Sequence, residues 1–365
     1  MKCIYCETNN TYPERVKNSQ RCSKCHHPFA MEPKTDPLQI SDGLFQRVIR
    51  DVSDGEKLFF TEQHLWYEFN RRLLKHKTLS CGAAATLLLV AGGAGFAMHH
   101  LGPALLGMSG LCFAATTTSR ASAAKLLRPK ISLPDFDSRY LSKWVNAHGQ
   151  IPKLLPPPAP SRGRLHTPQA QDITSYSFDR ALVTEHADIA AMLVANNFHF
   201  ENNCAILSLD GYPYQTAATV MEMLMRNPQL KVFALHDASV RGCEMPGKLR
   251  QTPWFPDPTI RLIDLGLRPK HIEATKLITL QRAQTTVPDP LRATLIPGEI
   301  LWLESGNVTE LTCMRPAKLM RAIYQGFARA NQMEAEGMLD STMTETTTIW
   351  VYDGGADVYA ADSFG

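Results

Sequence analysis

The amino-acid sequence predicts an α/β protein, with a parallel sheet flanked by helices. A small four-cysteine zinc ribbon and a two-helix transmembrane hairpin are predicted to precede it. Three observations lead to this fold class. Short apolar runs alternate with segments of helical period between residues 181 and 267, as in βαβ units. Two Cys-x2-Cys pairs stand near the N-terminus, and two long uncharged stretches follow them.

Length and composition permit several domains and exclude little. A chain of 365 residues can form two or three domains, and a net charge of +3 with 20% charged residues does not demand a nucleic-acid partner. Shifts in composition divide the chain into 1–36 (zinc ribbon), 37–77 (helical connector or partial winged helix), 78–118 (hairpin), 119–168 (helix and Pro-rich linker), 169–330 (α/β domain) and 331–365 (acidic segment).

The strongest local signal is the set Cys3, Cys6, Cys22 and Cys25. Two Cys-x2-Cys pairs at this separation can close a tetrahedron of thiolates around Zn²⁺, and four protein ligands make such a site structural. Two redox pairs are the alternative. Zinc ribbons contact nucleic acid or protein partners, and the sequence does not choose between them. The other cysteines stand singly, which is typical of reduced thiols in the cytosol.

Residues 41–75 are predicted to form two helices. Thr61 can cap the second one, Glu62–Leu74. The pair could belong to a helix-turn-helix or winged-helix unit, or could be a connector that packs against a membrane surface. The absence of a third helix in the pattern favours the connector.

Leu79–Met98 and Leu101–Thr118 contain no charged residue. As helices they would be roughly 30 and 27 Å long, close to the thickness of a bilayer core. Basic residues on both outer flanks predict a two-pass membrane protein with both termini cytoplasmic. The alternative is a pair of helices buried in a large core.

Two acids follow predicted strands in the α/β region. Glu185 comes after Ala181–Thr184, and Asp237 comes after Val232–Leu235. Ligands of parallel sheets bind at the carboxyl ends of strands, so these acids are expected to share one crevice. Paired carboxylates are suitable Mg²⁺ ligands. Alternatively, Glu185 only caps the predicted helix Ala187–Asn196.

The order of these motifs resembles the Toprim domain, above all that of the A subunit of type IIB topoisomerases and of meiotic double-strand-break proteins. The family's glutamate matches Glu185, its first aspartate Asp237, and its glycines Gly242 and Gly266. Its second aspartate falls on Ser239, a weaker ligand, although Glu244 could supply a third acid.

The resemblance implies metal-dependent chemistry on DNA, and Ser239 puts the cleavage step in doubt. The family's catalytic tyrosine lies in a preceding winged helix. Tyr67 is similar to it in position, and is interpreted more readily as a remnant or a coincidence than as a nucleophile.

Three further elements complete the prediction: a strand at Ile300–Glu304, an amphipathic helix at Pro316–Asn331, and a strand at Thr346–Tyr352. A helix is also predicted at Thr216–Arg226.

Two functions follow. The first is a membrane-tethered, Mg²⁺-dependent protein that binds or processes nucleic acid. The second is a catalytically inactive, membrane-anchored scaffold that binds protein partners through the ribbon and the Toprim-like fold. The sequence does not decide whether the protein is an enzyme.

Overall fold

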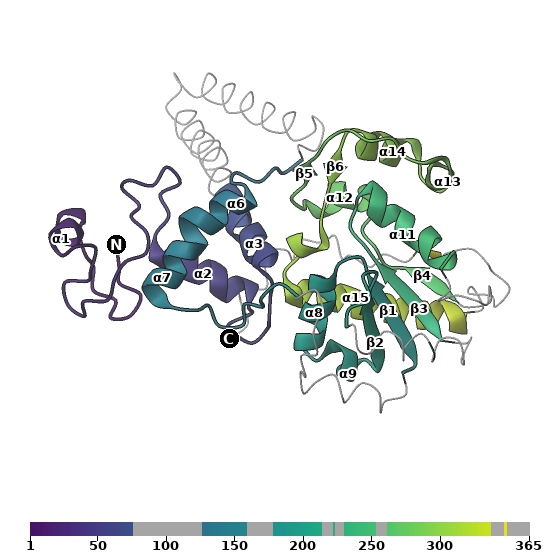
Figure 1. Cartoon of the computed structure of the whole chain (residues 1–365), viewed down its shortest axis with the longest axis horizontal. Helices are drawn as coiled ribbons and strands as arrows, with labels where there is room; N and C mark the ends of the chain where they lie inside the picture. Colours follow the sequence, from purple (N-terminus) through teal and green to yellow (C-terminus); the bar gives the residue numbers. More distant parts are fainter. Residues whose placement is uncertain are drawn as a thin grey trace, which may run out of the picture.

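The structure is a computed structural model, and it describes residues 1–75, 126–158, 178–213, 222, 230–252, 261–336 and 347–348. The chain begins with a ribbon, continues with a helical module, and ends with an α/β sheet (Figure 1). The predicted helix Thr216–Arg226 lies outside the described residues, apart from residue 222.

The ribbon consists of two similar Cys-x2-Cys turns around α1 (Tyr12–Lys17). Each turn is closed by an antiparallel bridge, Lys2 to Asn9 in the first and Arg21 to Pro28 in the second. The residue after the second cysteine of each turn, Glu7 or His26, has a positive φ near 60°. The two turns therefore have the same backbone form.

The helical module contains α2 (Asp42–Val52), α3 (Glu62–Lys75), α6 (Leu133–Phe136), the π-helix η1 (Asp137–Leu141) and α7 (Ser142–His148). Aromatic side chains fill its centre, with Phe45 and Phe69 packing on Phe136. The two predicted helices within 41–75 are confirmed as α2 and α3. Ser41 caps α2 through the backbone N–H of Leu44.

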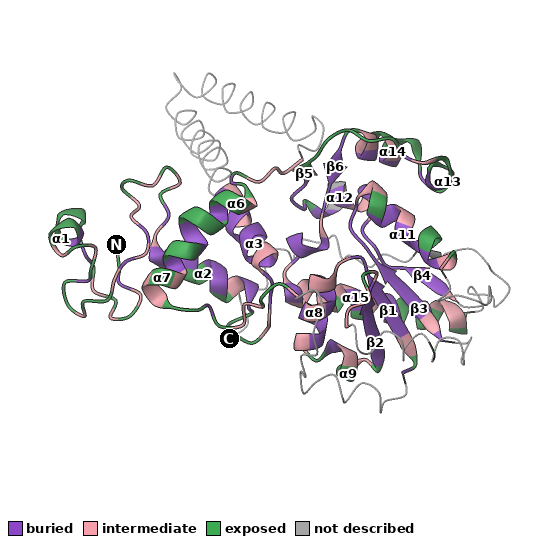
Figure 2. Ribbon diagram, in the orientation of Figure 1, coloured by how far each residue is buried: buried purple, intermediate pink, exposed green. Residues whose placement is uncertain are grey.

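The main sheet is parallel and has the strand order β2-β1-β3-β4-β7. Its strands are β1 (Arg180–Thr184), β2 (Cys204–Ser208), β3 (Lys231–Leu235), β4 (Leu262–Asp264) and β7 (Thr347–Thr348). The prediction of a parallel sheet flanked by helices is confirmed. Figure 2 shows β1, β2 and β3 largely buried, as expected for a sheet with both faces covered.

Alternate residues of the strands point to opposite faces. Leu182 and Phe233 face a core shared with α8 (Ala187–Ala195) and α15 (Pro316–Ala335), whereas Val183 and Ala234 face α11 (Val240–Arg250). The first core continues without a break into the aromatic centre of the helical module. The sheet and the helical module are therefore packed as one body.

The remaining elements are α9 (Phe198–Glu201), α12 (Pro269–Thr275), β5 (Leu280–Gln281), α13 (Asp289–Arg292), α14 (Pro297–Glu304), β6 (Asn307–Val308) and the 3-10 turn η4 (Leu311–Cys313). The predicted strand Ile300–Glu304 is wrong, because these residues belong to α14. Pro297 occupies the first turn of α14, and the Glu299 carboxylate accepts the backbone N–H of Ile296. Both features start a helix.

The predicted transmembrane hairpin is also corrected. Among the described residues, no helix is both long and apolar enough to cross a membrane. The longest described helix, α15, carries Lys318, Arg321, Arg329 and Glu334, and charges are costly to bury in hydrocarbon. The stretches 79–98 and 101–118, on which the prediction rested, lie outside the described residues. The fold is therefore α/β without the predicted hairpin. The predicted two-pass membrane localisation is not supported either.

Candidate functional site

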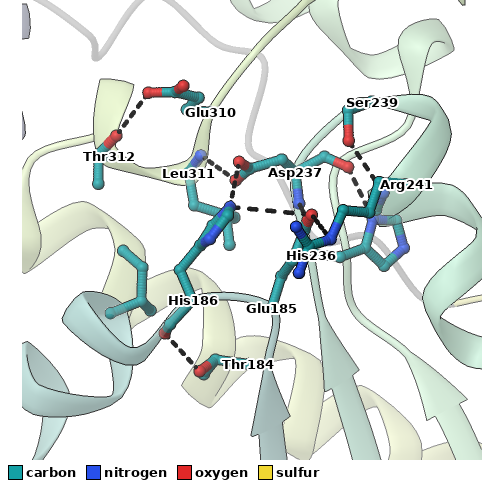
Figure 3. A network of polar contacts seen from close by, with 12 residues as sticks. Thr184, Glu185, His186, His236, Asp237, Ser239, Arg241, Glu310, Leu311 and Thr312 are labelled. Atoms are coloured by element: carbon teal, nitrogen blue, oxygen red, sulfur yellow. Dashed lines mark hydrogen bonds and ion pairs between the residues drawn. The ribbon is translucent and has the colours of Figure 1, made fainter. Parts of the chain in front are cut away.

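Glu185 and Asp237 lie side by side because β1 and β3 are neighbours. The pairing of the strands continues one residue further, where the backbone N–H of Glu185 donates to the carbonyl of Leu235 at 2.9 Å. The backbone N–H of Asp237 then donates to Oε2 of Glu185 at 3.1 Å. Both residues are buried, with 2% and 4% of their surface exposed. The expected meeting of the two acids at one edge of the sheet is observed (Figure 3).

Each carboxylate is held by a backbone N–H through one oxygen. Leu311 donates to Oδ1 of Asp237 at 2.8 Å, as Asp237 does to Oε2 of Glu185. The hydrogen bond to Glu185 therefore comes from Asp237 and not from the first turn of α8. The other two oxygens, Oε1 of Glu185 and Oδ2 of Asp237, face His186.

His186 links the two carboxylate oxygens that accept no backbone hydrogen bond. Its Nε2 lies 3.1 Å from Oδ2 of Asp237 and 3.8 Å from Oε1 of Glu185. The hydrogen bond with Asp237 raises the pKa of His186 to about 9, against the effect of burial. Ligand atoms of Glu185, His186 and Asp237 all lie within 4.8 Å of one another. The Nε of Arg241 also lies 3.8 Å from Oε1 of Glu185. The imidazole of His186 and the guanidinium of Arg241 are thus the present counter-ions of the two carboxylates.

Burial and the charge of Asp237 raise the pKa of Glu185. Two buried carboxylates this close repel each other, and a cation between them relieves the repulsion. The trio could hold a divalent ion: Mg²⁺ through the carboxylate oxygens, and Mn²⁺ through these and the neutral imidazole.

A second histidine, His236, lies against the backbone of Asp237. The Nδ1 of His236 lies 2.8 Å from the carbonyl oxygen of Asp237, and its Nε2 lies 3.0 Å from Oδ1 of Asp264. Both neighbours are acceptors, so both ring nitrogens donate. Burial acts to lower the pKa of His236, but Asp264 raises it above its ordinary value. His236 and Asp264 therefore form a buried ion pair behind the two acids.

The remaining predicted site residues lie outside the group formed by Glu185, His186 and Asp237. Ser239 caps α11, its hydroxyl accepting the backbone N–H of Gly242 at 2.9 Å. Glu244 accepts Nζ of Lys248 at 2.7 Å and is not one of the three grouped residues. Gly242 and Gly266 both lie at the site. A Cβ on Gly242 would approach Oε2 of Glu185 to 2.8 Å, and one on Gly266 would approach the His236 ring to 2.2 Å.

Tyr67 reaches the same region from the helical module. Its hydroxyl donates to Oε2 of Glu310 at 3.1 Å, and its side chain is fully buried. Burial and the charge of Glu310 raise the pKa of Tyr67 well above its ordinary value. In this arrangement the phenol is neither exposed nor ionisable near neutral pH, and attack on phosphate requires both exposure and alignment.

A cleft of about 440 Å³ lies between the helical module and the edge of the sheet. The helical module contributes Glu62 and Gln63, and the sheet side contributes Asp188, Asp237 and Glu310. Its apolar lining includes Leu133, Leu155, Pro157 and Pro158, and also Ile189 of α8. Burial raises the pKa of Glu62, Asp188 and Glu310. Arg282 also lines the cleft and pairs with Glu310 at 2.7 Å. The cleft therefore combines an excess of acids over bases with a surface that suits an apolar or planar group.

Sequence reasoning missed Glu310 as a cleft residue. It comes two residues after the short strand β6, in the same relation that Asp237 has to β3. That signal was hidden because the preceding helix, α14, was predicted to be a strand.

The four N-terminal cysteines also come together. The Sγ atoms of Cys3 and Cys25 are 3.5 Å apart, and those of Cys6 and Cys22 are 3.6 Å apart. A tetrahedral ZnS₄ site with Zn–S bonds of about 2.3 Å has sulfurs about 3.8 Å apart. Asn10 donates to Sγ of Cys22 at 3.5 Å. The four thiols could therefore hold one metal ion such as zinc.

Comparison with known proteins gives no assignment: no family model, no curated protein and no solved structure matches this chain.

Proposed function

We propose that the protein binds a divalent metal ion at Glu185 and Asp237 and uses it to hold nucleic-acid phosphate in the cleft. One observation carries the proposal. Each of these neighbouring carboxylates is fixed by a backbone N–H through one oxygen, while its other oxygen faces a common cation position. Carboxylates fixed in this way need not move to receive a metal, although the cations of His186 and Arg241 beside them would have to give way.

A metal at this position would leave coordination sites for water and for a phosphate oxygen, as Mg²⁺ sites commonly do. It would stabilise negative charge on a phosphodiester and orient it for attack. His186 would either leave the two oxygens or remain as a neutral ligand. The Toprim-like order of Glu185, Asp237, Gly242 and Gly266 supports nucleic acid as the source of the phosphate.

Metal titration tests this proposal. The full chain with its cysteine site filled by zinc should bind Mn²⁺ or Mg²⁺ in calorimetry. Glu185→Gln should abolish this binding, because it removes one of two charged ligands. Glu244→Gln is the matched control, since it removes an acid on the adjacent helix that lies outside the metal-ligand group. Unchanged binding by Glu185→Gln would refute the proposal.

A non-catalytic scaffold is the second candidate, and the position of Ser239 favours it. The hydroxyl that replaces the family's second aspartate already accepts a helix-capping hydrogen bond, so only two acids hold the metal. Supercoiled plasmid separates the candidates. Nicking that requires added Mg²⁺ or Mn²⁺ supports the enzyme, whereas metal binding without nicking supports a metal-stabilised binding protein.

A further inference from the structure

A group of basic side chains lies where α3 meets the start of α15. We name it the cation cluster, and it consists of Arg71, Arg72, Arg315, Lys318 and Arg321. Two carboxylates, Glu68 and Asp51, face it.

Glu68 is the buried centre of the ion pairs. Its side chain is 1% exposed, and Arg315 binds it in a bidentate manner, with Nε and Nη2 each 2.9 Å from a carboxylate oxygen. Arg71 pairs with Glu68 as well, and Arg72 pairs with Asp51. Five positive charges against two negative charges leave an excess of three.

The excess positive charge is concentrated on α15. Within the described part of the chain, neither Lys318 nor Arg321 forms an ion pair with a carboxylate. Burial lowers the pKa of Lys318, and the neighbouring Arg315, Arg71 and Arg321 lower it further. The ammonium therefore stands in a positive field that the protein's own acids do not cancel.

The cation cluster adjoins the cleft through η4. Thr312 lines the cleft, and Arg71 donates to the carbonyl oxygen of the next residue, Cys313. On α3, Tyr67 reaches Glu310 in the cleft, and the following residue is Glu68. Arg71 of the cation cluster is thus bonded to the residue that follows a cleft-lining threonine, and α15 begins three residues further along the chain.

We propose that the cation cluster binds the phosphate backbone of a nucleic acid without reading its sequence. This inference rests on the proposed function and locates the surface that holds the substrate beyond the metal. Guanidinium groups match phosphate oxygens in geometry. Each phosphodiester carries one negative charge, so an excess of three is balanced by several successive phosphates and not by one.

The test is binding of a fluorescein-labelled DNA duplex to the full zinc-loaded chain, measured by anisotropy at several salt concentrations without added Mg²⁺ or Mn²⁺. Each phosphate contact contributes about 0.9 to the slope of log affinity against log salt. Lys318→Gln combined with Arg321→Gln should lower the slope by about 1.8. Neither residue takes part in the ion pairs around Glu68, so the variant should keep the thermal stability of the parent chain.

Lys143→Gln combined with Arg329→Gln is the charge-matched control, because it removes two exposed cations elsewhere. This control should retain the parental slope. An equal slope in all three proteins, or no binding by the parent, would overturn the inference. Glu185→Gln should leave the slope unchanged, so failure here is distinguishable from failure of the metal site.

Discussion

Gly242 and Gly266 were noted in the sequence only because they match a family pattern, and the structure gives each a physical reason. Both stand where another residue of the site approaches the backbone too closely for a side chain. A Cβ on Gly242 would lie 2.3 Å from the backbone oxygen of Asp237, and one on Gly266 would meet His236. These glycines let α11 and the end of β4 close around the two acids.

Gly242→Ala should therefore damage the site. The added methyl group would displace Asp237 or Glu185, so we expect at least a tenfold loss of Mn²⁺ affinity and about 1–3 kcal/mol of lost stability. Calorimetry and urea unfolding measure the two effects. Gly247→Ala is the control on the same helix, because its Cβ would meet nothing within 4 Å; it should gain up to about 1 kcal/mol. Normal metal binding by Gly242→Ala would contradict the geometry of the site.

Glu185 and Asp237 could be predicted from the sequence because each follows a strand whose apolar pattern is clear. Glu310 and His186 could not be assigned in the same way. Glu310 comes 73 positions after Asp237, and only the fold of the intervening chain brings it to the cleft. The burial of Tyr67 is equally invisible in the sequence, since it depends on how the helical module docks on the sheet.

At the scale of elements, periodicity succeeded where the segments were long or clearly alternating. The predictions for β1, β3, α8 and α15 are confirmed within one residue at their starts. The stretch Ile300–Glu304 failed because five apolar-rich residues fit a strand and a helix equally well. The start signals at Pro297 and Glu299 were the deciding information.

The start of α3 makes the protein sensitive to acid. The Nδ1 of buried His64 accepts hydrogen bonds from the backbone N–H and the hydroxyl of Thr61, the latter at 2.7 Å. Burial lowers the pKa of His64 to about 3, compared with about 6.5 in an unfolded chain. The unfolded state therefore binds the additional proton, and the stabilisation is present above pH 6.5 and is lost as pH falls toward 3.

Replacing His64 by a group that does not titrate should reduce this dependence. In urea unfolding at pH 4 to 6, the free energy of unfolding of His64→Asn should change less steeply than that of the parent chain, by about 1.4 kcal/mol per pH unit. The asparagine oxygen can replace Nδ1 as the acceptor for Thr61. Parallel pH profiles for the two proteins would show that His64 is protonated in the folded state.

At the scale of the whole molecule, some modules could be predicted from the sequence and others could not. The four-cysteine ribbon follows from spacing alone, because a tetrahedral thiolate site has strict local requirements. The joining of helical module and sheet by one core depends on contacts between distant residues, such as Phe59 with Asn196 at 2.8 Å. The membrane hairpin was inferred from hydropathy and flanking basic residues, and no described helix supports it.

The ribbon should depend on its metal ion more than the rest of the chain does. Its buried apolar cluster contains only Cys3, Cys22 and Phe29. A cluster this small does not stabilise a folded segment of this length without a bound metal or a disulfide. Cys22→Ser should release bound zinc and expose Lys17, Arg21 and Lys24 to trypsin, while the sheet remains resistant. Zinc analysis and mass spectrometry of the fragments measure this. An intact ribbon in the zinc-free variant would show that its fold does not require the ion.

The cleft has one wall on each of two modules, and this has a thermodynamic consequence. Any molecule that fills it is in contact with both modules at once, so its binding free energy is coupled to the free energy of their docking. By reciprocity, docking of the helical module on the sheet strengthens binding of that molecule by the same factor by which the bound molecule strengthens the docking. Binding in the cleft and docking of the two modules are then coupled equilibria, and a measurement of either one reports on the other.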